Sequence, residues 1–230
     1  MIIYGKQIVL FVLENHADLV EEVMFAKEVD SKLFTKFAKL NKPIIKLDNK
    51  KAQGLAHGGN HQGFFLKISQ PNFATLSDIK KSKFLVVLDG LTDMGNIGAI
   101  VRSSYALGVD AIVVTGIRDL KLEQIIRTSS GTALDMPLLS HFDISDLINQ
   151  LKFENFSIIG ADMDGENIKE FKQNLPKIAL VVGNEGSGLN NKVIKKLDHK
   201  VSIKMSRGFD SLNVSVATAI LVHQLKGISN

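Results

Sequence analysis

Apolar residues change their spacing about one third of the way along the chain. Before residue 70, helical and strand-like periods alternate, which predicts a small α/β unit. The expected order is helix, strand, helix, strand, short helix and strand, at residues 6–15, 21–27, 31–40, 43–48, 49–56 and 62–69. The following segment, SQPNFATLSDIKKSK, has turn-forming residues and no period. It therefore predicts a linker, which we place at 71–82.

The apolar runs become continuous after residue 83. Strands that are buried on both faces have this pattern, so we expect an α/β fold with a mostly parallel sheet covered by helices. The predicted strands are at 84–89, 111–116, 157–162, 178–183 and 201–205. Helices are expected at about 97–107, 119–130, 144–153, 189–197 and 213–225. The chain is thus predicted to hold a first domain at 1–70 and a second at 83–230.

Composition indicates an ordinary globular protein, with 45% apolar and 23% charged residues. Cysteine is absent, which excludes disulfides, a thiolate nucleophile and cysteine-ligated metal and fits a reducing cytoplasm. The run IVLFVL (8–13) is short for a signal peptide and lacks a cleavage site. No run approaches the roughly 20 apolar residues of a membrane span. We therefore expect a cytoplasmic protein with no membrane partner.

The positive charge lies in the first part of the chain. The net charge is +4, of which residues 1–70 carry +3, residues 71–82 carry +1 and the rest none. Such an excess suits a polyanion such as RNA, although a solvated lysine surface has the same composition. The chain has four Arg against twenty-four Lys. Because lysine is the default cation here, each arginine suggests a geometric need for a planar donor, and the first of them is Arg102.

Three turns rich in glycine and polar residues follow predicted strands: DGLTDMGNIG (89–98), GNEGSGLN (183–190) and MSRGFDSLNVS (205–215). The carboxyl ends of strands are where open α/β sheets bind ligands. The first turn lacks the G-x-G-x-x-G dinucleotide fingerprint and no P-loop is present, so a nicotinamide-dependent oxidoreductase is disfavoured. Each turn alone is typical of a helix cap, as Ser211 or Asn213 before the last helix would be. Together they predict a ligand site.

The motifs in these turns are MGNIGAIVR (94–102), GNEGSG (183–188), and IKM (203–205) followed by SLNVS (211–215). In this order and context they resemble the SpoU/TrmH family, S-adenosylmethionine-dependent RNA ribose 2′-O-methyltransferases of the SPOUT class. The resemblance covers about 83–230. The first domain, with IIYGKQIVLFVLENH near its start and HQGFF (61–65) near its end, is similar to the L30e-like substrate-binding domain of the ribosomal RNA guanosine methyltransferase branch.

The resemblance implies a C-terminal trefoil knot and a homodimer with its active site near the subunit interface. It implies that S-adenosylmethionine meets main-chain groups of Gly183, Ile203 and Leu212. It also assigns Arg102 to activating the ribose hydroxyl. Because a guanidinium stays protonated at neutral pH, we expect Arg102 to stabilise alkoxide charge or to orient the ribose, while phosphate or water assists proton loss.

The remaining candidates have supporting roles in this picture. Asn96 would orient Arg102 or the ribose, and Glu185 would hold Arg102 or its own loop. Ser211 and Asn213 would position substrate or shape the donor loop. His57 and His61 are candidates for RNA contact or plain loop histidines. The six histidines show no metal-ligand spacing, so no metal is expected.

The favoured function is methylation of a guanosine in large-subunit ribosomal RNA. A tRNA ribose methyltransferase is the next alternative, followed by a resistance-type ribosomal methyltransferase. A non-catalytic RNA-binding protein on the same scaffold is a further alternative, which the complete set of candidate residues disfavours.

Overall fold

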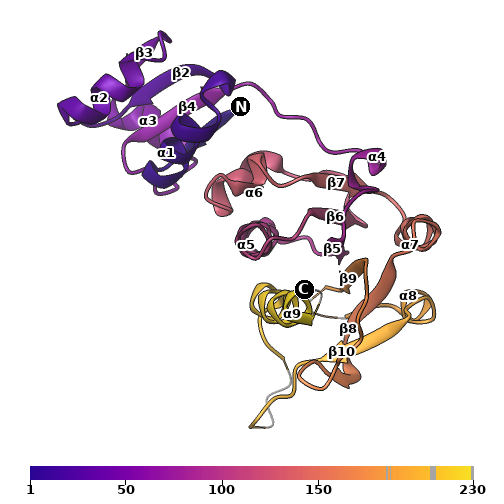
Figure 1. Cartoon of the computed structure of the whole chain (residues 1–230). Helices are drawn as coiled ribbons and strands as arrows, with labels where there is room; N and C mark the ends of the chain where they lie inside the picture. Colours follow the sequence, from indigo (N-terminus) through magenta and orange to yellow (C-terminus); the bar gives the residue numbers. More distant parts are fainter. Residues whose placement is uncertain (185, 187, 208–210, 229–230) are drawn as a thin grey trace. The chain divides into compact units, whose positions relative to one another are not determined.

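The computed structural model describes residues 1–184, 186, 188–207 and 211–228, which form two compact units (Figure 1). The first unit comprises residues 1–72 and 122–134, and the second comprises 73–121 and 135–230. Helix α6 (Leu122–Thr128) and the short helix η2 (Thr132–Leu134) therefore group with the first unit, although they follow two strands of the second.

The first unit contains a mixed sheet in the order β1-β4-β2-β3. The β2 and β3 strands are parallel, while β4 runs antiparallel to both β1 and β2. All six predicted elements are present, and β1 is an addition that is too short to show a period. The elements are β1 (Ile2–Tyr4), α1 (Lys6–Asn15), η1 (Ala17–Leu19), β2 (Val20–Phe25), α2 (Ser31–Ala38), β3 (Ile44–Lys46), α3 (Asn49–Leu55) and β4 (Phe64–Ile68).

Two aspartates start helices in this unit. The carboxylate of Asp30 accepts the N–H of Leu33 at 2.9 Å, and that of Asp48 accepts the N–H of Lys51 at 2.8 Å. Each thereby satisfies an otherwise unpaired donor in the first turn of its helix. Phe37 anchors α2, because its ring lies edge-on to Phe25 of β2 with the centroids 5.1 Å apart.

The second unit is built on a six-stranded sheet in the order β10-β8-β9-β5-β6-β7, in which every pair is parallel. This confirms the predicted parallel sheet. Strand β7, which has four residues, was missed by the prediction. The prediction of a strand at 201–205 was wrong at both ends. The strands are β5 (Phe84–Asp89), β6 (Ala111–Thr115), β7 (Leu138–His141), β8 (Ser157–Asn167), β9 (Ile178–Val182) and β10 (His199–Ser202).

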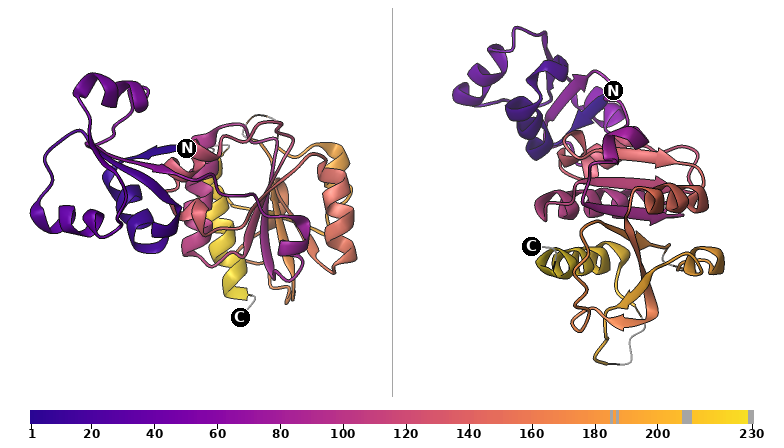
Figure 2. Two further views of the ribbon diagram at one scale, coloured as in Figure 1. Left: turned by 90° about the horizontal axis from the view of Figure 1, so that it is seen from above. Right: turned by 45° about the vertical axis from the view of Figure 1, so that its right-hand side comes forward.

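Helices cover both faces of this sheet (Figures 1 and 2). On one face, α5 packs against α9, and on the other α7 lies beside α8. Alternate residues of β5 such as Leu85 and Val87 join the α7 side of the core, as the two-residue period of a strand requires. The helices are α4 (Leu76–Ile79), α5 (Met94–Ala106), α7 (Ile144–Phe153), α8 (Asn191–Ile194) and α9 (Val214–Ile228).

The segment predicted as a linker contains the short helix α4. The carboxylate of Asp78 accepts both the backbone N–H and the hydroxyl of Thr75 at 2.7 Å, which fixes the start of the helix. The hydroxyl bond, and then the backbone bond, hold the pKa of Asp78 below its usual value. Leu76 and Ile79 pack into the core beside α7. Two apolar residues in one turn are too few to produce a period, so the pattern missed this helix.

Strand β8 is longer than the predicted 157–162 and carries a bulge. Its pairing with β10 passes from Gly160 opposite Lys200 directly to Glu166 opposite Val201. Five residues of β8, at 161–165, therefore have no counterpart on β10. Gly165 closes the bulge, because a Cβ there would lie 2.6 Å from backbone atoms of Val201. Only glycine allows the two backbones this approach.

The trefoil knot and the L30e-like character of the first unit stay predictions. In the part of the chain that the structure describes, no helix is long and apolar enough to cross a bilayer.

Replacing Gly165 with alanine should destabilise the second unit, because the new Cβ meets backbone that has no side chain to move aside. We expect a loss of about 2–3 kcal/mol, the upper range for overpacking, measured by urea unfolding. Gly54→Ala is the matched control. It lies in α3 with no atom within 4 Å of the new Cβ, so it should stabilise by up to about 1 kcal/mol. Equal stability of the Gly165→Ala variant and the wild type would contradict the bulge geometry.

Candidate functional site

The loops after β5 and β9 meet at the carboxyl edge of the sheet. These strands are neighbours, and β5 continues through α5 to β6 on its other side, so they flank the switch point where such sheets bind ligands. The side-chain amide nitrogen of Asn184 lies 3.6 Å from the position that a Cβ would take on Gly90. Two of the three predicted turns are therefore in contact.

The third turn joins them through a side-chain hydrogen bond. The Nδ2 of Asn213 donates to the Oδ1 of Asn96 at 3.0 Å, across 117 residues of sequence. The backbone N–H of Asn96 donates to Asp93 at 2.6 Å, which also caps α5. The structure thus brings Asn96 and Asn213 together at the first turns of α5 and α9.

The hydrogen bonds of Ser215 determine which way both amides face. A backbone N–H can only donate, so the atom of Asn213 that lies 2.9 Å from the Ser215 nitrogen must be the oxygen. The Ser215 hydroxyl donates to the same oxygen at 2.5 Å. The other end of the Asn213 amide, its NH₂, therefore faces Asn96 and meets an oxygen there. It follows that Asn96 turns its own NH₂ away from Asn213, as a donor.

A cavity of about 710 Å³ lies between the β8 bulge, the segment after β10 and the start of α9. This volume is in the usual range for small-molecule sites. The structure places three predicted residues, Ile203, Ser211 and Leu212, in its wall. The full lining is Ala161, Asp162, Met163, Gly165, Asn167, Val201, Ser202, Ile203, Lys204, Met205, Ser211, Leu212, Ala217 and Leu221.

Several main-chain polar groups along this wall have no hydrogen-bond partner among the described residues. Ile203, Lys204 and Met205 follow the end of β10, and within the described residues their main-chain groups make no hydrogen bond. The same holds for Leu212. Such groups are normally paired, so a ligand that offers both donors and acceptors fits here, with Leu212 and Leu221 as apolar wall for a flat ring. A nucleoside has this chemistry.

Gly183 directly follows β9 (Ile178–Val182) and does not line this cavity. A Cβ on Gly183 would collide with the backbone of Gly188. The sequence pointed to a bound ligand as the reason for a glycine here. The structure supplies an internal reason, since the loop closes on itself between Asn184 and Gly188.

Arg102 is exposed on α5, six residues beyond Asn96, and does not line the cavity. Six residues of helix span about 9 Å along the axis and about 120° around it, so helix geometry alone does not put Arg102 and Asn96 on one face of α5. Glu185, the remaining predicted residue, lies outside the described residues.

His61 has a structural role in the first unit. Its Nδ1 accepts the N–H of Gly63 at 3.0 Å, and its ring lies 4.9 Å from that of Phe65. His57 is exposed and has a positive φ of 47°. Among the described residues, no three His, Asp or Glu side chains gather as metal ligands.

Sequence reasoning missed three contributors to the site. Asp93 was detectable, because an aspartate three residues before Asn96 at a helix start is a capping signal. Ser215 was quoted within its motif but given no role. The β8 bulge, which supplies Asp162 and Met163 to the cavity, left no signal, because its polar residues resemble a loop.

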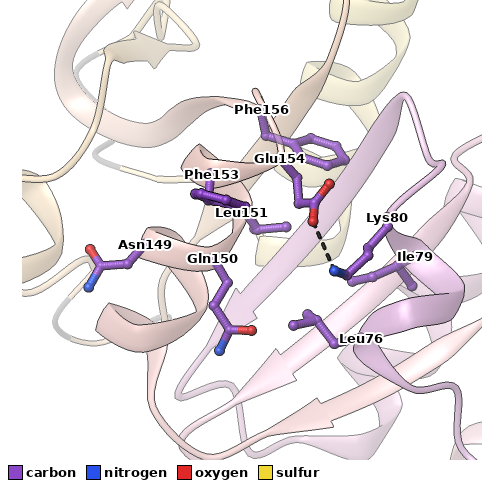
Figure 3. Close-up of a pocket in the computed structure, with 9 residues that line it drawn as sticks. All are labelled: Leu76, Ile79, Lys80, Asn149, Gln150, Leu151, Phe153, Glu154 and Phe156. Atoms are coloured by element: carbon purple, nitrogen blue, oxygen red, sulfur yellow. Dashed lines mark ion pairs between the residues drawn. The ribbon is translucent and has the colours of Figure 1, made fainter.

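A second, smaller cavity lies between α4 and α7 (Figure 3). Its volume is about 260 Å³, and the ion pair between Lys80 and Glu154, at 3.0 Å, spans its edge. It lies near the amino ends of the strands, opposite the edge where open α/β sheets bind ligands. It holds none of the predicted residues; its lining is Leu76, Ile79, Lys80, Asn149, Gln150, Leu151, Phe153, Glu154 and Phe156.

Comparison with known proteins identifies the family of both parts of the chain. Residues 83–223 match the SpoU rRNA Methylase family, and residues 2–74 match a family described as RNA 2′-O ribose methyltransferase substrate binding. An uncharacterized tRNA/rRNA methyltransferase of Borreliella burgdorferi is 32% identical over 81% of this chain and 88% of the relative. The 23S rRNA (guanosine-2′-O-)-methyltransferase RlmB of Yersinia pestis is 30% identical over 97% of this chain and 96% of the relative.

A solved structure extends the similarity to the fold. The SpoU methyltransferase AviRb from Streptomyces viridochromogenes, in complex with AdoMet, has a TM-score of 0.80 at 22% identity and covers 99% of this chain and 89% of its own. The chain therefore belongs to the SpoU family of RNA 2′-O-methyltransferases, enzymes that take their methyl group from S-adenosylmethionine.

Proposed function

We propose that this protein methylates the ribose 2′-hydroxyl of a guanosine in large-subunit ribosomal RNA. The observation that carries the chemistry is the meeting of three distant turns at one sheet edge, where Asn96 is oriented as a donor beside a nucleoside-sized cavity. The ribosomal target is supported by the guanosine-2′-O-methyltransferase relative, which is 30% identical along 97% of the chain. Its similarity includes the RNA-binding first unit, not the second alone.

The cavity of Ile203 and Leu212 is the proposed donor site. Its unpaired main-chain groups would hold the polar edge of an adenine, and its apolar side chains would hold the ring. S-adenosylmethionine supplies an electrophilic methyl carbon on a sulfonium. Gly183 would act through the shape of its loop, and Ser211, at the mouth of the same cavity, would help position substrate.

Asn96 and Arg102 are proposed to serve the attacking ribose oxygen. This oxygen gains negative charge as its proton leaves, so donors that are already oriented lower the barrier. Asn96 can donate, and a neutral amide is no base for the hydroxyl proton in either orientation. Arg102 is a permanent donor and is likewise no base. We propose that a substrate phosphate or water takes the proton.

A homodimer would complete the site. Arg102 lies outside the donor cavity of its own chain. Helix α9 is apolar around most of its circumference, and its Val216 is 48% exposed, as is 42% of Tyr105 on α5. An apolar helix pair with an exposed face is typical of a subunit interface. We propose that a second copy packs on α5 and α9 and brings its Arg102 to the cavity.

A cytoplasmic location would suit this RNA substrate.

Incubation with labelled S-adenosylmethionine and deproteinised ribosomal RNA tests the function. Mass spectrometry of the nuclease-digested RNA should find one ribose-methylated guanosine. If tRNA is methylated and ribosomal RNA is not, the target is a tRNA ribose. The absence of any methyl transfer would support the non-catalytic alternative.

Arg102→Ala should lower kcat by about 10²- to 10³-fold, the usual loss for one oriented donor at a developing oxyanion. The affinity for S-adenosylhomocysteine, measured by calorimetry, should stay within about twofold, because Arg102 is proposed to meet the attacking ribose oxygen and not the donor. Arg102→Lys is the matched control; it keeps the charge and loses the planar fork, so it should recover activity only in part. A large loss of donor affinity in Arg102→Ala would contradict this role.

Mixing two inactive variants tests the shared site. Leu212→Glu should block the donor cavity, while Arg102→Ala leaves it intact. If Arg102 acts across the interface, each mixed dimer holds one complete site, and co-refolding should recover about one quarter of wild-type activity. No recovery despite mixed dimers, shown by tagged copurification, would mean that Arg102 acts within its own chain or that the dimer differs.

Asn213→Asp tests the orientation of the amides. It keeps the oxygen that faces Ser215 but puts a second oxygen against Asn96, which should rotate the Asn96 amide and lower kcat by about 10²-fold. Donor affinity should be unchanged. Ser215→Ala is the control, because the backbone N–H of residue 215 still orients Asn213, so kcat should fall only a few-fold. Similar kcat values for the two variants would refute the orientation argument.

A further inference from the structure

The positive charge of this protein is more localised than its net charge suggests. Residues 29–60 hold seven Lys and two Asp, which gives +5, while the whole chain carries +4. The rest of the molecule is therefore slightly negative, at −1. All seven lysines belong to or adjoin the elements α2, β3 and α3 of the first unit: Lys32, Lys36, Lys39, Lys42, Lys46, Lys50 and Lys51.

Three of these lysines form a stripe along one side of α2. At 100° per residue, Lys32, Lys36 and Lys39 fall within about 60° of one another and extend about 10 Å along the axis. All three are exposed. Phe37 lies about 140° from Lys32 and is fully buried against Phe25, which fixes the helix with the stripe facing outward.

Carboxylates do little to neutralise this stripe. The two aspartates in the segment are used as helix caps, Asp30 toward Leu33 and Asp48 toward Lys51. Of the seven lysines, Lys36 alone makes an ion pair within the described residues, a 3.7 Å contact to Glu14 in which both side chains are about 60% exposed. Such a pair contributes little.

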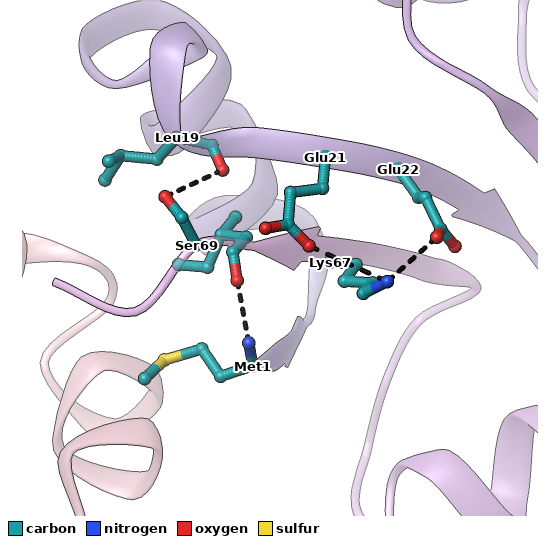
Figure 4. A network of polar contacts seen from close by, with 7 residues as sticks. Met1, Leu19, Glu21, Glu22, Lys67 and Ser69 are labelled. Carbon is teal, nitrogen blue, oxygen red and sulfur yellow. Dashed lines mark hydrogen bonds and ion pairs between the residues drawn. The ribbon is translucent and has the colours of Figure 1, made fainter.

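Lys67, in the same unit, shows the contrasting arrangement (Figure 4). Its ammonium lies 3.0 Å from Glu22 and 3.7 Å from Glu21. The hydrogen bond to Glu22 raises the pKa of Lys67. The two carboxylates largely neutralise the charge of Lys67, whereas the charges of the α2 lysines are nearly uncompensated.

We propose that the Lys32–Lys36–Lys39 stripe of α2 is the surface that binds the phosphate backbone of the RNA substrate. This rests on the proposed function and names the face that performs its binding step. About 10 Å of nucleic-acid strand presents about three phosphates, which matches three lysines over the same length. Lysine is a point charge, and contacts to phosphate carry no sequence information directly. The stripe therefore positions RNA without selecting its sequence.

The test is the salt dependence of RNA binding by the full chain. Replacing Lys32, Lys36 and Lys39 with Gln should reduce the slope of log Kobs against log salt by about 2–3, since each phosphate contact contributes about 0.7–0.9. Between 50 and 200 mM salt, the wild type should then lose about 20- to 40-fold more affinity than the variant. Fluorescence anisotropy with deproteinised ribosomal RNA, repeated with bulk tRNA, should give the same change in slope for both.

A second triple variant controls for net charge. Lys6→Gln, Lys27→Gln and Lys67→Gln remove the same charge from the same unit but away from the stripe; Lys67 is paired, and Lys27 lies 4.6 Å from the ring centroid of Phe64. Its slope should stay within about 1 of the wild type. Gln has nearly the helix propensity of Lys, so the α2 variant should keep its melting temperature.

The outcomes separate this proposal from the proposed function. An unchanged slope for the α2 variant, or equal losses in both triple variants, would overturn the stripe as the RNA surface. An unchanged slope is also the result expected if the stripe binds an acidic protein instead of RNA. Methyl transfer is scored separately, on the wild type. A wild type that binds RNA with the expected slope but transfers no methyl group would overturn the function and leave the stripe standing.

Discussion

The hydrogen bond between Asn213 and Asn96 is the interaction on which the proposed active site depends. It joins the first turn of α5 to the first turn of α9, so two motifs that are 117 residues apart act as one unit. Since Ser215 can only donate from its backbone, the direction of every bond in this chain is determined without reference to a ligand. A capping interaction at the start of α9 thereby sets which end of the Asn96 amide would meet substrate in the proposed mechanism.

The second constraint is the backbone that surrounds the donor cavity. Strand β10 ends at Ser202, and beyond it the main-chain groups of residues 203–205 make no hydrogen bond within the described residues. The strands hold the cavity wall rigid, and the main chain that follows β10 offers the ligand hydrogen-bonding groups without partners among the described residues. This combination favours a ligand with an alternating set of donors and acceptors, and Gly165 is what allows the bulge to close.

In the proposed function, the two units differ in the type of cation that meets the RNA. The first unit contributes lysines, whose charge is long-ranged and tolerant of geometry, and these suit the holding of a phosphate backbone. Among its candidate residues the second unit offers Arg102, whose planar donors suit a single oxygen. Affinity and chemistry are thus assigned to different side chains, and each can change without disturbing the other.

Strands β5, β6 and β9 were predictable from sequence, because a short continuous apolar run is typical of a strand that is buried on both faces. Glycine and asparagine at the three turns likewise predicted a ligand edge, and their motifs indicated the family. Strands β1 and β7 and helix α4 were missed, since three or four residues show no period. The β8 bulge, the internal reason for Gly183 and the orientation of Asn96 depend on contacts between distant residues. Sequence determined which groups are available, and tertiary structure decided which atoms face one another, because hydrogen-bond direction is a property of pairs.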